Sequence, residues 1–91
     1  MDIGILADGH RQSSPIRRLS SERSSWRVVV QTWPHQDGFH GRIVFEADGA
    51  RPAGETREGP ADLAGSTRED VVRSAHELPE RRLRALLHSL S

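Results

Sequence analysis

Two runs of alternating apolar and polar residues, residues 26–33 and 39–46, dominate the middle of the chain. A period of two residues is typical of a β-strand with one buried face. Residues 34–38 lie between the runs and end in Asp37-Gly38, a pair that favours hairpin turns. The pattern therefore predicts a β-hairpin with a five-residue loop. Its buried face is formed by Trp26, Val28, Val30, Phe39, Ile43 and Phe45.

The opposite face of this hairpin mixes polar and apolar side chains. Val29, Trp33 and Val44 fall on it, beside Arg27 and Arg42. An exposed apolar patch with a polar rim is typical of an association surface, and tryptophan is enriched where binding energy concentrates. These five residues are therefore the predicted binding site. The alternative is that Trp33 shields the sheet edge, or packs under the N-terminal tail or under the loop of residues 51–63.

Two amphipathic helices are predicted after residue 65. Ser66 and Glu69 have the spacing of a capping box, in which each side chain bonds the backbone N–H of the other residue. Pro79 ends the first helix and suits the first turn of the second. The apolar stripes are Val71, Val72, Ala75 and Leu78 in the first helix, and Leu83, Leu86, Leu87 and Leu90 in the second.

The remaining segments are poor in large apolar residues. Residues 1–25 are rich in Ser and Arg and predict a disordered tail, because little apolar burial offsets the entropy of ordering. Residues 51–60 predict a loop, and a short third strand fits within residues 56–63. Pro60 would confine that strand to a sheet edge or divide it into two fragments.

The predicted fold class is α+β. An antiparallel β-hairpin, extended to two or three strands, is followed by two C-terminal helices packed on one face. The small α+β domain covers residues 26–91, after the tail of residues 1–25.

Composition and net charge narrow the classes of protein to which this chain could belong. All 13 basic residues are Arg, 13 residues are acidic, and the formal net charge at pH 7 is zero, so the basic excess of a nucleic-acid-binding protein is missing. The use of Arg throughout the chain fits the codon bias of a GC-rich bacterial genome. The chain has no cysteine, which excludes disulfides and thiolate sites. No apolar stretch is long enough to span a membrane, so we expect a cytoplasmic protein.

Candidate chemistry is sparse. His35, Asp37 and His40 surround the predicted hairpin loop, and His10 could approach from the tail. Imidazole and carboxylate groups bind zinc, but these loop positions fix no coordination geometry, so solvated side chains are the favoured interpretation. No serine lies in a G-x-S-x-G motif, and no glycine-rich phosphate loop is present. We therefore predict no enzyme activity, no metal and no cofactor.

The second predicted helix carries the basic residues Arg81, Arg82, Arg84 and His88. They could face phosphates or an acidic partner. Glu77 and Glu80 lie one turn from Arg81 and Arg84, which favours a solvated helix face with internal ion pairs. Nucleic-acid binding through this helix is the less favoured alternative.

The segment Gly65-Ser66-Thr67-Arg68-Glu69-Asp70-Val71, preceded by two strands, resembles the helix start in the N-terminal domain of HicB-type antitoxins. The resemblance covers residues 26–78. It implies a partial ribonuclease-H-like fold without catalysis and a toxin as the partner. The family has a fourth strand where residues 83–90 here predict a helix.

Taken together, the residues predict a small non-catalytic protein–protein interaction domain. We expect its partner to be another protein or a second copy of the chain. A HicB-like toxin-binding module is the alternative.

Overall fold

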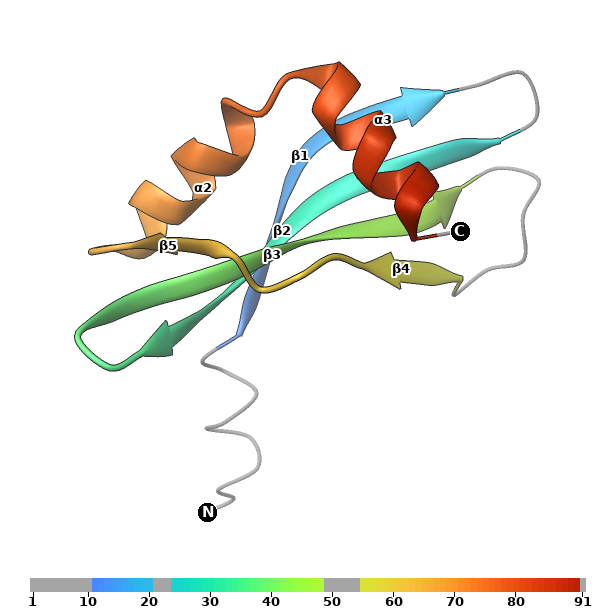
Figure 1. Ribbon diagram of the computed structural model, residues 1–91. Coiled ribbons are helices and arrows are strands. Elements are labelled where there is room, and N and C mark those ends of the chain that lie inside the picture. Colours follow the sequence, from blue (N-terminus) through green and yellow to red (C-terminus); the bar gives the residue numbers. More distant parts are fainter. Residues whose placement is uncertain (1–10, 21–23, 49–54, 91) are drawn as a thin grey trace, which may run out of the picture.

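The computed structural model describes residues 11–20, 24–48 and 55–90. One antiparallel sheet is followed by two helices, and both helices lie over the same face of the sheet (Figure 1). The predicted α+β fold is therefore confirmed. The elements are β1 (Gln12–Ser20), β2 (Ser25–His35), β3 (Gly38–Asp48), β4 (Thr56–Glu58), β5 (Leu63–Gly65), α2 (Arg68–His76) and α3 (Glu80–Ser89).

The β2–β3 hairpin has the predicted faces but a tighter turn. Val28 lies opposite Phe45 and Val30 opposite Ile43, so these side chains share the face under the helices. The prediction of a five-residue loop was wrong, because the pairing of β2 with β3 continues to His35 and Gly38. Only two residues connect the strands, and the first, Gln36, has a φ of 54°. The extra pairing brings Pro34 and His35 into the strand, where alternation alone had not placed them.

The hydrophobic core lies between the sheet and the two helices. Its buried members are Leu19, Trp26, Val28, Val30, Ile43, Phe45, Val71, Ala75 and Leu83. Phe39, Leu86, Leu87 and Leu90 are partly buried against it, as the sequence predicted for the same face. Gly41 allows α2 to approach the sheet, since a Cβ atom there would lie 2.6 Å from Cγ1 of Val71.

Strand β1 corrects the prediction of a disordered tail over residues 1–25. It pairs antiparallel with β2 and forms an edge of the sheet. A bulge between Pro15 and Arg17 breaks the strict alternation, and this lets Ile16 and Leu19 both pack on the core despite their spacing of three. Leu19 is 1% exposed. The early part of the tail, residues 1–10, lies outside the described residues.

The sequence of β2 explains why this strand requires β1 as a hydrogen-bonding neighbour. Val28, Val29 and Val30 are all buried, so β2 is apolar on both faces and is a central strand. A central strand needs hydrogen-bonding neighbours on both sides. The polar residues of β1 meet this requirement through their backbone, which hydrophobic periodicity does not reveal.

The predicted third strand is present as two fragments. β4 and β5 both pair with β3, and the chain between them contains Gly59 and Pro60. The interruption has the expected cause, because proline cannot donate a ladder hydrogen bond. The backbone N–H of Gly59 still donates to the carbonyl of Ile43 at 2.8 Å.

Helix α2 begins one residue later than the capping-box prediction. Thr67 is its N-cap, and the Thr67 hydroxyl accepts a hydrogen bond from the backbone N–H of Asp70 at 3.1 Å. The predicted cap at Ser66 was therefore wrong by one position. A partly buried contact then fixes the helix to the sheet: Nε of Arg68 donates to the hydroxyl of Thr32 at 3.1 Å. Thr32 itself is 0% exposed.

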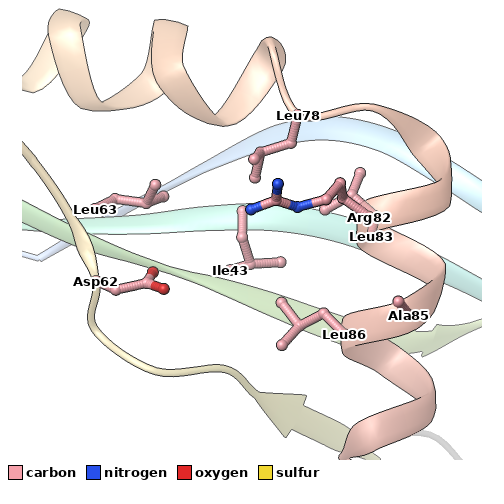
Figure 2. A pocket seen from close by; sticks show the side chains of 8 residues that line it. All are labelled: Ile43, Asp62, Leu63, Leu78, Arg82, Leu83, Ala85 and Leu86. Carbon is pink, nitrogen blue, oxygen red and sulfur yellow. The ribbon is translucent and has the colours of Figure 1, made fainter.

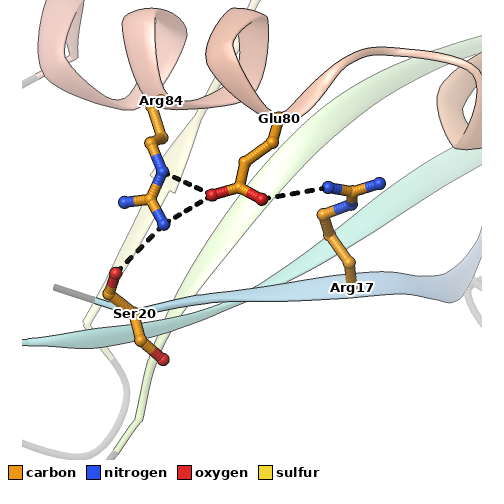
Figure 3. A network of polar contacts seen from close by, with 4 residues as sticks. All are labelled: Arg17, Ser20, Glu80 and Arg84. Carbon is orange, nitrogen blue, oxygen red and sulfur yellow. Dashed lines mark hydrogen bonds and ion pairs between the residues drawn. The ribbon is translucent and has the colours of Figure 1, made fainter.

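Polar contacts join α3 to β1 (Figure 3). Arg84 donates through Nε to Glu80 at 2.8 Å and through a terminal nitrogen to the backbone carbonyl of Ser20 at 3.1 Å. The other carboxylate oxygen of Glu80 lies 3.5 Å from Arg17. These contacts place the first half of α3 over the end of β1.

Neither α2 nor α3 is long and apolar enough to cross a membrane, and the same holds for every helical segment among the described residues.

Candidate functional site

The face of the sheet turned away from the helices, here called the outer face, holds all five residues of the predicted binding site. Along the hairpin, Val29 lies opposite Val44, Gln31 opposite Arg42, and Trp33 opposite His40. Arg27 lies opposite Glu46 at the other end. Pairing of β2 with β3 thus places Trp33 and Arg42 near each other toward the turn, Val29 beside Val44 midway along the hairpin, and Arg27 at the far end.

Val29 and Val44 are buried, which corrects their expected exposure. Their exposed fractions are 5% and 6% in the single chain. Both valines are flanked by a strand on each side, because Val29 pairs with Pro15 of β1 and Val44 with Glu58 of β4 in addition to their pairing with each other. The expected patch of three exposed apolar side chains is therefore reduced to Trp33, which is half-buried.

Ion pairs cover the end of the outer face away from the hairpin turn. A terminal nitrogen of Arg18 lies 3.2 Å from Asp48, and Nε of Arg27 lies 3.8 Å from Glu46. Arg27 and Trp33 lie six positions apart in β2, which at about 3.3 Å per residue places them roughly 20 Å apart. Arg27 therefore belongs to this charged end and has no place beside Trp33.

At the turn end, the Trp33 ring contacts two arginines, Arg11 immediately before β1 and Arg42 in β3. The guanidinium carbon of Arg11 is 4.9 Å from the centroid of the Trp33 ring, and that of Arg42 is 5.2 Å away. These distances are typical of cation–π contacts. We call Arg11, Trp33 and Arg42 the Trp33 cluster. Arg42 also donates to Glu58 of β4 at 3.0 Å.

Two members of this environment were missed by sequence reasoning. Arg11 reaches Trp33 only because β1 pairs with β2, and Glu58 reaches Arg42 only because β4 pairs with β3. Both depend on short or polar strands at the sheet edges. The run of three valines in β2 was the available indication that a further strand had to be present.

Within the described part of the chain, the histidines near the turn do not form a metal site with their neighbours. His35 and His40 lie with their ring centroids 4.0 Å apart at an interplanar angle of 35°. Across the described ranges, no group of three or more His, Cys, Asp or Glu side chains could hold a metal ion. His10, the fourth residue considered, lies outside those ranges.

A cavity of about 490 Å³ lies on the helix side of the sheet (Figure 2). Leu83 and Leu86 of α3, Leu78 from the corner between the helices, and Ile43 and Leu63 from the sheet provide its apolar lining. Arg82 and Asp62 also line it. The basic residues predicted on α3 are all exposed, and Arg84 is in addition paired with Glu80; they are Arg81, Arg82, Arg84 and His88.

No protein-family model matches the chain, and no curated protein or solved structure is significantly similar to it.

Proposed function

We propose that this protein is a small non-catalytic interaction domain that binds another protein, or a second copy of itself, through the outer face of its sheet. The observation that carries the proposal is the half-buried Trp33, which lies on the face opposite the two helices. The other two apolar side chains of the predicted binding site, Val29 and Val44, are already buried in the single chain. Trp33 is the large apolar group that remains accessible there.

The surroundings of Trp33 fit a binding anchor better than a residue that completes the core. Arg11 and Arg42 contact the ring with their guanidinium groups, so charged side chains lie against it on this face. Tryptophan and arginine are the residue types that most often supply binding energy at protein interfaces. A partner that covers the ring would gain its apolar contact without any rearrangement of the core.

Sedimentation equilibrium over a concentration series tests the proposal, together with retention of partners from host cells on the immobilised protein. Trp33→Ala should weaken self-association or retention of a partner by about 2 kcal/mol, or roughly 30-fold in Kd. The far-UV circular dichroism of this variant should match the wild type. Trp26→Ala is the contrast, because Trp26 is 4% exposed in the core and its truncation should unfold the chain. Equal association of Trp33→Ala and wild type would overturn the proposal.

A second candidate is the toxin-binding role implied by the resemblance to HicB-type antitoxins. It is favoured by the order of elements, because antiparallel strands precede the helix that begins after Thr67. In this chain α3 occupies the place of the family's fourth strand. Co-expression with the product of the neighbouring gene tests this role: rescue of growth that depends on Trp33 would support it, and a lack of rescue would contradict it.

A further inference from the structure

The charges of the Trp33 cluster are incompletely balanced. Arg42 has an acidic partner, since it lies 3.0 Å from Glu58. Arg11 is exposed and donates to the neutral amide oxygen of Gln31 at 3.4 Å. The cluster and its contacts among the described residues thus contain two guanidinium groups and one carboxylate. An additional anion beside Trp33 would balance them.

Arg42 adds an unsatisfied hydrogen-bond donor. Its Nε is buried and has no hydrogen-bond partner within the described part of the chain. A buried donor without an acceptor is unfavourable, and a guanidinium binds a carboxylate best through two parallel hydrogen bonds. A carboxylate arriving beside the ring would allow Arg42 to turn and use this donor. Both arginines therefore favour an incoming oxygen anion.

We propose that the partner presents an acidic side chain, next to an apolar one, to the Trp33 cluster. The inference rests on the proposed function and specifies the chemistry of the partner. The apolar side chain contacts the Trp33 ring, and the carboxylate bridges Arg11 and Arg42. Trp33 thus provides contact area, while the two arginines select for negative charge.

The remainder of the outer face favours a short acidic protein segment over a nucleic acid. Glu46, Asp48 and Glu58 lie on or beside the same face. These carboxylates pair with Arg18, Arg27 and Arg42, so a phosphate backbone running along the face would meet no continuous row of unpaired positive charge, and the chain as a whole has no net positive charge. A single acidic side chain needs only the turn end, where the Trp33 cluster lies.

The test uses the full chain labelled with ¹⁵N and four probes of similar length. Three are capped hexapeptides that alternate leucine with glutamate, glutamine or lysine, and the fourth is hexathymidylate. The two tryptophan indole N–H resonances report binding, and Trp33→Phe assigns them. The glutamate peptide should shift the Trp33 resonance and leave that of Trp26 in place. It should bind at least five times more tightly than the glutamine peptide, and more weakly at 1 M salt than at 0.1 M.

Two matched variants identify the source of this selectivity. Arg11→Gln should weaken binding of the glutamate peptide about tenfold, because one charge-assisted contact is lost. Arg81→Gln removes the same charge from exposed α3 and should have no effect. Equal binding of the glutamine peptide, tighter binding of hexathymidylate, no shift at Trp33 with any probe, or an unaffected Arg11→Gln variant would each overturn the inference.

Failure of the acidic preference can be distinguished from failure of the proposed function. If the glutamate peptide fails while Trp33→Ala still weakens association or partner retention, the outer face remains the binding surface and only the acidic preference is wrong. If Trp33→Ala also has no effect, the proposed function is wrong as well.

Discussion

Truncation of Leu19 is the sharpest test of the role of β1 in the fold. Leu19 is 1% exposed and belongs to the core, although its strand is otherwise mostly polar. Leu19→Ala removes three carbon atoms, worth about 2.4 kcal/mol of transfer free energy at about 0.8 kcal/mol each. The cavity that remains adds to this loss, so we expect a total near 3 kcal/mol. In a domain of this size the melting temperature should fall by about 12–24 °C.

Thermal unfolding followed by circular dichroism measures this change. Ser13→Ala is the matched control, because Ser13 is exposed on the same strand and its truncation should cost less than about 0.5 kcal/mol. If Leu19→Ala does not fold, Leu19→Val provides a smaller truncation with an expected loss of about 1 kcal/mol. A Leu19→Ala protein as stable as the wild type would refute the reasoning, since residues 12–20 would then not contribute to the core.

Two further substitutions test local features of the chain. Thr67→Ala should destabilise the protein by about 1 kcal/mol in urea unfolding, because the side-chain cap of α2 is lost. Ser66→Ala should have almost no effect. A larger loss of stability in Ser66→Ala than in Thr67→Ala would show that Ser66 is the N-cap. Gln36→Gly should raise the free energy of unfolding by about 0.5–1 kcal/mol, since glycine tolerates the φ of 54° at the hairpin turn. A loss of stability in that variant would show that the Gln36 side chain makes a stabilising contact.

The core of the fold could be predicted from sequence because its elements bury one face each. Alternation identified the inward side chains of β2 and β3, and helical spacing identified Val71, Ala75 and Leu83. These patterns arise directly from burial. Strand β1 could not be predicted in the same way, because its bulge disrupts the alternation and its pairing depends on backbone hydrogen bonds that carry no side-chain pattern.

The candidate site was predictable only in part. Trp33 and Arg42 were placed on the correct face because the hairpin register follows from alternation. The burial of Val29 and Val44 was missed, since it depends on the outer strands: Val29 pairs with Pro15 of β1 and Val44 with Glu58 of β4. Arg11 was missed because its contact with Trp33 requires pairing across a different strand. Contacts between elements far apart in sequence thus account for most of the difference.

The order of strands in the sheet also has a consequence for folding kinetics. β1, β2, β3 and β4 lie side by side in the order in which they occur in the chain. Such local pairing closes short loops, which speeds folding. The hydrogen bond between Arg84 and Ser20 spans 64 residues, so α3 should dock late. Substitutions in the β2–β3 hairpin should therefore slow folding, whereas loss of the Arg84 contact should mainly accelerate unfolding.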